Sequence, residues 1–178
     1  SLPDSYIEDI QEDATGNLWV RTGAGYAIYN SVSDIFDRNV EGWMWHIGIS
    51  GNPSTVYIDS EKIFWIYVAG KGIYCYKPGQ ENAVMVAGTD TLLTEMNITD
   101  MTECSEGILL AFGNGVLACL DREKLNVKWT FDGIASQWGK NQSETFTLFV
   151  DSHERVWMYS VEGMWVYHLP KKSWEVRS

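Results

Sequence analysis

The sequence predicts an all-β fold built from four similar antiparallel sheets. Its 178 residues contain one pattern four times: an acidic residue, an aromatic or apolar residue six positions later, then a glycine and an aromatic. The anchors of these copies, Trp19, Trp65, Leu109 and Trp157, are separated by 46, 44 and 48 residues. Aromatic residues form 13% of the chain, which suits sheets packed face to face, because large rings fill the space between layers. A repeat of this length made of short strands is typical of a β-propeller blade.

Three copies keep both the acidic residue and the tryptophan. They are Asp13 with Trp19, Asp59 with Trp65, and Asp151 with Trp157. The third copy is degenerate, because it begins at Glu103, has leucine at the tryptophan position and ends in Cys119 where the other copies have tyrosine. The chain therefore contains one clear repeat, two good ones and one weak one.

The first repeat shows how the strands of one sheet arise. Between the first two strands, residues 13–17 predict a turn, since an aspartate can bond its own backbone and Gly16 accepts a positive φ. Residues 23–25 predict the second turn. No stretch shows sustained helical periodicity, and the most helix-like piece is a turn at Glu123 and Lys124. The strands of this repeat are predicted at 6–11, 18–22, 26–30, and either around Phe36 or later over 43–47.

We predict a single β-propeller segment, 1–178, of about four four-stranded antiparallel blades. Four blades either close on themselves or form an arc of a larger propeller. An arc exposes apolar sheet at both ends, so we expect it to pack against remaining blades of a parent protein or another copy of itself. The chain starts at Ser1 without an initiator methionine, which suggests an excised segment. The blades are expected at approximately 1–50, 51–95, 96–143 and 144–178.

Charge and composition exclude several classes of partner. The net charge of −11 argues against nucleic acid, because phosphates would be repelled and few basic side chains are present to release counterions. No run of 18 apolar residues occurs, so no membrane insertion by this segment is expected. Three cysteines, Cys75, Cys104 and Cys119, give no disulfide framework, and we interpret them as small buried apolar residues.

No catalytic or metal site is expected. The acidic residues Asp13, Asp59 and Asp151 recur at one place in each blade, whereas catalytic groups must converge on one point. We therefore interpret them as structural turn residues, together with Gly16 and the tryptophans of the repeat. The three histidines are not at metal-ligand spacing, and no motif for a cofactor occurs.

Four residues are candidates for binding a ligand. Trp138 is the first, because it lies in the polar stretch 135–143 that lengthens the third step of the repeat. Trp43, Trp45 and His46 follow, since flat rings stack on sugar faces. The structural alternatives are that Trp43 and Trp45, two residues apart, share a buried sheet face, and that Trp138 covers a blade edge.

The repeats resemble the two-component regulator propeller family. The match over residues 7–30 is almost complete: an apolar strand, then Glu12-Asp13-Ala-Thr-Gly16-Asn17-Leu18-Trp19, a threonine, a glycine-rich turn and a strand that ends in an aromatic. Leu2-Pro3 also agrees with the dipeptide that commonly precedes this motif. The second and fourth copies lose the Gly-Asn turn and the threonine, and the third also loses the aspartate and tryptophan.

This resemblance implies the periplasmic sensor region of a hybrid two-component system, of the kind abundant in gut Bacteroidetes. In such proteins large propellers precede a small β-sandwich, a membrane helix and a histidine kinase, and they sense carbohydrate breakdown products. The resemblance therefore implies an oligosaccharide ligand and a segment that is not itself an enzyme. Two alternatives stay open: a propeller hydrolase or lyase acting on polysaccharide, which convergent carboxylates in one pocket would favour, and a plain interaction scaffold, which fully buried aromatics without a cleft would favour.

Overall fold

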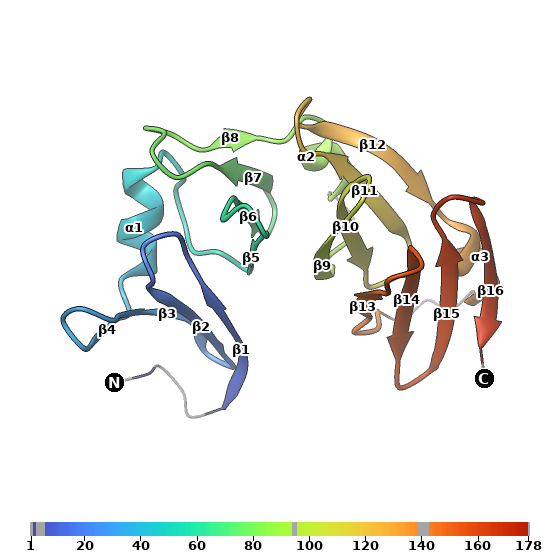
Figure 1. The fold of residues 1–178 in the computed structure, drawn as a ribbon, viewed down its shortest axis with the longest axis horizontal. Coiled ribbons are helices and arrows are strands. Elements are labelled where there is room, and N and C mark those ends of the chain that lie inside the picture. Colours follow the sequence, from blue (N-terminus) through green and yellow to red (C-terminus); the bar gives the residue numbers. More distant parts are fainter. Residues whose placement is uncertain (1, 3–5, 94–95, 139–142, 178) are drawn as a thin grey trace. The chain divides into compact units, whose positions relative to one another are not determined.

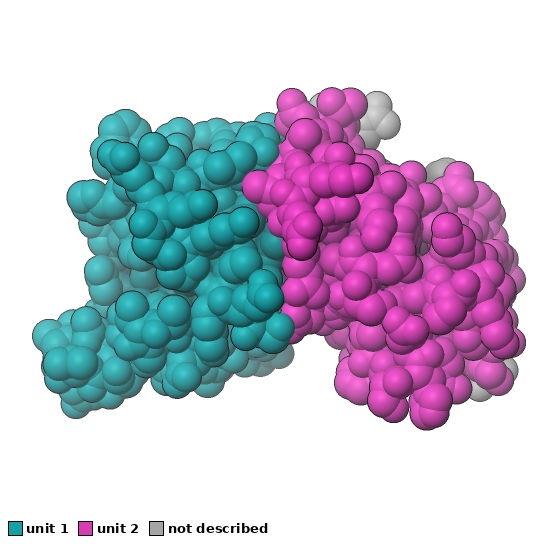
Figure 2. Space-filling model, turned by 45° about the horizontal axis from the view of Figure 1, so that its top comes forward, with its two compact units in different colours: residues 1–85 teal, residues 86–178 magenta. Residues whose placement is uncertain are grey.

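The structure, a computed structural model, describes residues 2, 6–93, 96–138 and 143–177. The described residues form four four-stranded antiparallel sheets, each made of strands that are consecutive in sequence (Figure 1). The predicted all-β class and its four-stranded sheets are confirmed. The chain divides into two compact units, Ser1–Met85 and Val86–Ser178 (Figure 2). Each unit contains two of the sheets. The single-domain assignment with its blade boundaries stays a prediction.

The first sheet of unit 1 follows the repeat closely. Trp19 on the second strand lies opposite Ile28 on the third, and the register continues to Thr22 opposite Gly25 at the hairpin. The fourth strand is the one predicted around Phe36, which lies opposite Tyr29. The strands of this sheet are β1 (Ile7–Glu12), β2 (Leu18–Thr22), β3 (Gly25–Asn30) and β4 (Ile35–Asp37).

The alternative fourth strand over 43–47 is wrong, because Val40–His46 forms helix α1. The Asn39 side chain accepts a hydrogen bond from the Gly42 amide at 3.0 Å and caps the first turn. Val40 and Met44, four residues apart, are both buried. A helix of seven residues is too short to show a helical period in the sequence.

Two further short helices lie in unit 2, where the sequence pattern indicated none. They are α2 (Thr89–Leu92) and α3 (Gly133–Trp138). The turn expected at Glu123 and Lys124 is present, and both backbone amides donate to the Asp121 carboxylate at 3.0 and 2.9 Å.

The two sheets of unit 1 enclose one apolar core. The second sheet contains β5 (Thr55–Ile58), β6 (Phe64–Val68), β7 (Gly72–Tyr76) and β8 (Val84–Met85). Trp19 of the first sheet is fully buried, and its ring centroid lies 5.2 Å from that of Phe64 in the second. The side chain of Gln11 also joins β1 to β5, because it donates to the Val56 carbonyl and accepts from the Ile58 amide, both at 2.7 Å.

Unit 2 repeats this arrangement. Thr99 and Asp100 of one sheet bond backbone groups at the start of the next sheet: the Thr99 hydroxyl donates to the Phe146 carbonyl at 2.8 Å, and the Asp100 carboxylate accepts from the Leu148 amide at 2.8 Å. Apolar side chains of both sheets, with Ile134 of α3, form the core. The strands are β9 (Ile98–Cys104), β10 (Gly107–Phe112), β11 (Leu117–Asp121), β12 (Asn126–Phe131), β13 (Thr147–Val150), β14 (Arg155–Ser160), β15 (Gly163–His168) and β16 (Ser173–Arg177).

Candidate functional site

The turn between the first two strands of the repeat is organised by its aspartate. In the first copy one carboxylate oxygen of Asp13 accepts the backbone amides of Thr15 and Asn17 at 2.9 and 3.0 Å. The other oxygen accepts the indole N–H of Trp19 at 3.1 Å. A buried indole needs an acceptor for its N–H, so the acid and the ring six residues later form one unit.

The second and fourth copies use the same bonds. Asp59 accepts the Glu61 and Ile63 amides at 2.9 and 3.0 Å and the Trp65 indole at 3.0 Å. Asp151 accepts the Trp157 indole at 2.9 Å. The fourth residue of each turn has a positive φ, even where glycine is absent: 82° at Gly16, 65° at Lys62 and 59° at Glu154. The turn conformation is therefore the same in the copies that lack the Gly-Asn pair.

Asp151 has a further partner in the Arg155 side chain, whose Nε lies 2.6 Å from the carboxylate. Burial alone would raise the pKa of the Asp151 carboxyl, but the hydrogen bonds from Trp157, Arg155 and His153 hold this pKa well below its usual range.

The degenerate third repeat replaces this unit with other contacts. Leu109 occupies the tryptophan position, and the indole of Trp129 on β12 donates to Glu106 at 3.2 Å instead. Cys104 pairs in register with Gly107, and a Cβ on that glycine would lie 3.3 Å from the Cys119 sulfur. The missing side chain lets the two thiols meet, and the hydrogen bond from Cys119 lowers the pKa of Cys104 to about 7, whereas that bond and burial raise the pKa of Cys119. All three cysteines are free and buried, as predicted.

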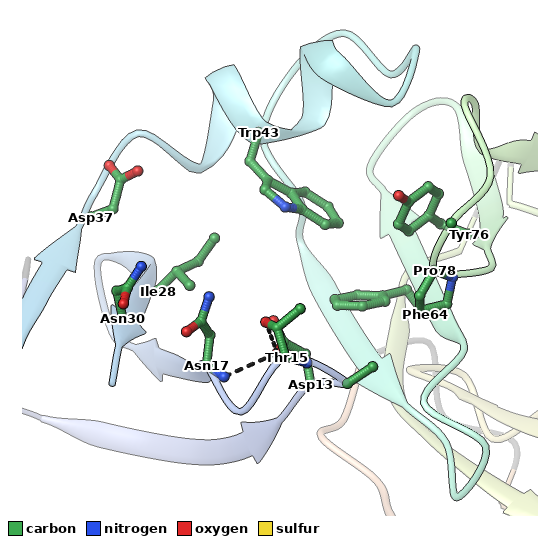
Figure 3. Close-up of a pocket in the computed structure, with 12 residues that line it drawn as sticks. Asp13, Thr15, Asn17, Ile28, Asn30, Asp37, Trp43, Phe64, Tyr76 and Pro78 are labelled. Carbon is green, nitrogen blue, oxygen red and sulfur yellow. Dashed lines mark hydrogen bonds between the residues drawn. The ribbon is translucent and has the colours of Figure 1, made fainter. Parts of the chain in front are cut away.

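Unit 1 contains a cavity of about 390 Å³ beside the first Asp turn (Figure 3). Its walls come from the turn itself, from the ends of β3 and β4, from α1 and from the second sheet. The residues that line it include Thr15, Asn17, Asn30, Asp37, Trp43, Phe64 and Tyr76.

Aromatic rings form one side of this cavity. Helix α1 places the Trp43 ring 5.2 Å from Phe64 and 5.7 Å from Tyr76, measured between centroids. Trp43 also lies edge-on to the buried ring of Trp19 at 4.6 Å. Part of the Trp43 ring is therefore packed into the core, and the remainder faces the cavity (Figure 3).

Polar side chains form the opposite side, where Figure 3 shows Asn17, Asn30 and Asp37. Asn30 uses its carbonyl oxygen to accept the Val32 and Ser33 amides at 3.0 and 3.1 Å, which leaves its NH₂ group for another partner. Within the described part of the chain, the side chain of Asn17 makes no hydrogen bond. The site thus places amide donors and acceptors opposite aromatic rings.

The structure separates the four residues that the sequence suggested for binding. Trp43 lines the cavity, but Trp45 is 69% exposed on another side of α1, and His46 is exposed and does not line the cavity. Trp43 and Trp45 do not share a sheet face, because residues two apart on a helix project in different directions. Trp138 ends α3 rather than lying in an irregular loop, and its side chain is outside what the structure describes. Their roles in binding stay predictions.

Sequence reasoning missed Asn17, Asn30, Phe64 and Tyr76 as a cavity lining. Asn17 and Tyr76 belong to the repeat itself, so they were interpreted as turn and strand residues. The available signal was their place at the turn ends, where loops of neighbouring sheets approach. Among the described residues, no group of three or more His, Cys, Asp or Glu side chains could hold a metal ion. The same part of the chain contains no helix long and apolar enough to cross a membrane.

The first repeat matches the family model described as "Two component regulator propeller" over residues 1–24, which confirms the resemblance there. Among solved structures, the extracellular domain of BT4673 from B. thetaiotaomicron, designated a hybrid two-component system, has a TM-score of 0.67 and 18% identity, and the match covers 97% of this chain and 21% of that one. The corresponding domain of BT3049 has a TM-score of 0.67 and 16% identity, with 99% and 23% covered.

PorZ, a surface component of the type-IX secretion system of Porphyromonas gingivalis, has a TM-score of 0.61 and 14% identity, with 97% and 22% covered. The chain thus spans about a fifth of the length of each of these three structures. Comparison with curated proteins finds no match. These likenesses show that the chain has the fold of a β-propeller segment.

Proposed function

We propose that this chain is a ligand-recognition segment of an extracytoplasmic sensor propeller in a hybrid two-component system. The family match of the first repeat and the fold shared with two extracellular domains of that class support this proposal. The ligand is a glycan fragment, the compartment is the periplasm, and a histidine kinase elsewhere in the protein receives the signal. The segment itself carries out no reaction.

The cavity of unit 1 is the proposed binding site, and its facing aromatic and amide walls are the observation that carries the proposal. A sugar ring offers C–H faces that pack on aromatic rings and hydroxyl groups that bond amides. Trp43 and Tyr76 supply the first kind of contact, while Asn17 and Asn30 supply the second.

Binding is favoured over hydrolysis by the state of the lining carboxylates. Both oxygens of Asp13 are engaged by the turn and by Trp19. Asp37 accepts the Asn39 amide at 2.8 Å. Glycoside hydrolysis uses one carboxylic acid to protonate the leaving group and a second carboxylate as nucleophile or base. With both oxygens held by donors of its own turn, Asp13 is not free to turn toward a bound saccharide as acid or nucleophile.

Signalling requires that the ligand bind one arrangement of the protein more tightly than another, because only differential affinity shifts an equilibrium. A site walled by two sheets of unit 1 meets this requirement, since a change in sheet packing alters the distance between its aromatic and polar walls.

The test is calorimetric titration with a panel of neutral oligosaccharides, using variants of the polar wall. Asn17→Ala removes an amide that bonds no described side chain. Asn30→Asp keeps the oxygen that holds the turn and removes the NH₂ donor. Each variant should bind about tenfold more weakly, because one lost hydrogen bond is worth roughly 1 kcal/mol or more.

Trp45→Ala is the matched control, since it changes an exposed tryptophan on the same helix outside the cavity. Wild-type affinity in Asn17→Ala and Asn30→Asp would refute this site. An equal loss of affinity in Trp45→Ala or Trp138→Ala would place the ligand elsewhere.

We also propose that the segment associates with a second copy of itself through the outer face of its last sheet. Phe149, Tyr159 and Met164 are 59, 40 and 39% exposed on that face, and the last two lie opposite one another in register. Clustered apolar side chains of this kind favour burial in an interface. Sedimentation velocity should show association that rises with concentration and weakens in Phe149→Lys with Tyr159→Lys. A monomer at every concentration would refute the proposal.

A further inference from the structure

The first and fourth repeats are related without insertion or deletion. Every residue from 13 to 37 has a counterpart 138 positions later, and the turn geometry is shared as well as the sequence spacing. Asp34 and Lys172, for example, both have a positive φ, at 57° and 53°. The matched pairs include Asp13 and Asp151, Trp19 and Trp157, Gly25 and Gly163, and Tyr29 and Tyr167.

This equivalence identifies the fourth-repeat counterparts of the polar wall. Among the polar residues that line the cavity of unit 1, Thr15, Asn17 and Asn30 are neutral at pH 7, whereas Asp37 is acidic and corresponds to the acidic Glu175. In the fourth repeat all three positions hold side chains that carry or can accept a positive charge. The replacements are His153 for Thr15, Arg155 for Asn17 and His168 for Asn30.

A cavity is also present at this second place, in unit 2. It measures about 270 Å³ and is lined by His153, Arg155, His168, Pro170 and Lys171. Two of the chain's three histidines therefore gather with an arginine and a lysine, in a protein whose net charge is −11.

Arg155 is held in place from two directions. Its Nε donates to Asp151 at 2.6 Å, and its guanidinium carbon lies 5.6 Å from the ring centroid of Trp157. No described residue bonds its two terminal nitrogens. A guanidinium fixed in this way presents a pair of parallel N–H donors, which matches the two oxygens of a carboxylate or a sulfate.

The other lining groups supply further hydrogen-bond donors, and nearby acidic side chains neutralise part of their positive charge. His168 Nε2 lies 3.6 Å from Glu175, and His153 Nδ1 lies 3.5 Å from the Ser152 hydroxyl. Lys171 is exposed and has no partner in the described part of the chain. Asp151 and Glu175 offset part of the positive charge, so the affinity of this cavity for an anion should be modest and should fall with added salt.

We propose that the fourth repeat carries a second subsite, which binds the carboxylate or sulfate group of an acidic saccharide. The oxyanion binds the terminal nitrogens of Arg155 with support from Lys171 and the two imidazoles. The saccharide class rests on the proposed function, whereas the preference for an oxyanion rests on the fourth repeat alone. One fold element thus serves two ligand chemistries, neutral in the first repeat and anionic in the fourth.

The test exchanges the chemistry of the two repeats. A triple variant gives the fourth repeat the residues that the first repeat has at the equivalent positions: His153→Thr, Arg155→Asn and His168→Asn. Titrations use digalacturonate, a sulfated disaccharide, inorganic sulfate and a neutral disaccharide. The acidic saccharides should bind about tenfold more weakly to the triple variant, because a charge-assisted bidentate contact is removed. Binding of the neutral disaccharide at unit 1 should be unchanged.

Because the triple variant also removes the Arg155–Asp151 pair, Lys171→Gln serves as a second variant, and thermal unfolding checks that both fold. Lys171→Gln should weaken the acidic saccharides severalfold and reduce the salt dependence of binding. Equal affinity of the triple variant and the wild type for digalacturonate would overturn the subsite. Inorganic sulfate bound as tightly as the acidic saccharides would overturn its saccharide specificity. Failure of Asn17→Ala to affect neutral sugar would count only against the site in unit 1.

Discussion

The bond between Asp59 and Trp65 gives the sharpest test of how the repeat stabilises its sheet. Asp59 is 2% exposed and Trp65 is fully buried, so neither group can turn to water if its partner is removed. Asp59→Asn keeps an oxygen for the amides of Glu61 and Ile63. It also turns an NH₂ group toward the indole N–H, where two donors then face one another.

The hydrogen bonds that each substitution removes set its expected cost. A hydrogen bond to a charged acceptor contributes about 1.5–3 kcal/mol, so Asp59→Asn should lower the free energy of unfolding by roughly 2–3 kcal/mol. Asp59→Ala leaves both amides and the indole without the acceptor and should cost about 3–5 kcal/mol, at the upper end of single substitutions.

Urea unfolding followed by tryptophan fluorescence measures these values, with the unfolding of each unit resolved where two transitions occur. Asp121→Asn is the matched control. Asp121 accepts the amides of Glu123 and Lys124 at 3.0 and 2.9 Å, but it accepts no indole, and an asparagine oxygen can replace both bonds. This control should change stability little. If Asp59→Asn proved no more costly than Asp121→Asn, the indole bond would not be what the repeat depends on.

Three other predictions concern the same turns and the third repeat. The folded-state pKa of Asp151 lies below its usual value, so its contribution to stability is present above the unfolded pKa of about 3.9 and is lost as pH falls below that value. The free energy of unfolding, measured from pH 6 into the acid range, should show this loss in the wild type and not in Asp151→Asn. The same pH dependence in both proteins would refute the prediction. Gly16→Ala should lower the free energy of unfolding by about 1 kcal/mol because the residue has a positive φ, and Lys62→Gly should raise it by up to about 1 kcal/mol for the same reason. Urea unfolding measures both values, and no difference from wild type would contradict the strain argument. Cys104 and Cys119 should form no disulfide on oxidation although their thiols are hydrogen-bonded, because β10 lies between their strands and two strand spacings hold the Cα atoms roughly 9–10 Å apart, beyond the roughly 7 Å that a disulfide tolerates; a mass loss corresponding to a disulfide in the native protein would refute this geometry.

The repeat is where sequence and structure agree most closely. An aspartate, a left-handed residue and a tryptophan six positions later define a local turn, and every bond in that turn joins residues at most six apart. Local chemistry of this kind is readable in a sequence, and it predicted the sheets, the turns and the structural role that the aspartates were assigned. The same argument explains why Lys62 and Glu154 adopt the glycine conformation, which their residue types did not reveal.

The candidate sites were less accessible to the sequence. Helix α1 is only about two turns long, and so short a run of apolar positions is also compatible with a strand. The Asn39 cap that starts the helix is seen only in the structure. That ambiguity placed Trp43 and Trp45 together, whereas the helix turns one toward the core and cavity and the other toward solvent.

The amino-acid sequence alone determined the fold class of this protein, because strand alternation, turn residues and the bond from the acid to the indole act over a few positions along the chain. Only the tertiary structure decided which side chains line a cavity. Asn17 and Tyr76 are far apart in sequence and line one cavity because two sheets pack face to face. His153, Arg155 and His168 form a basic pocket because antiparallel pairing returns β15 beside β14. Packing between sheets sets distances that no local pattern encodes, and ligand chemistry depends on those distances.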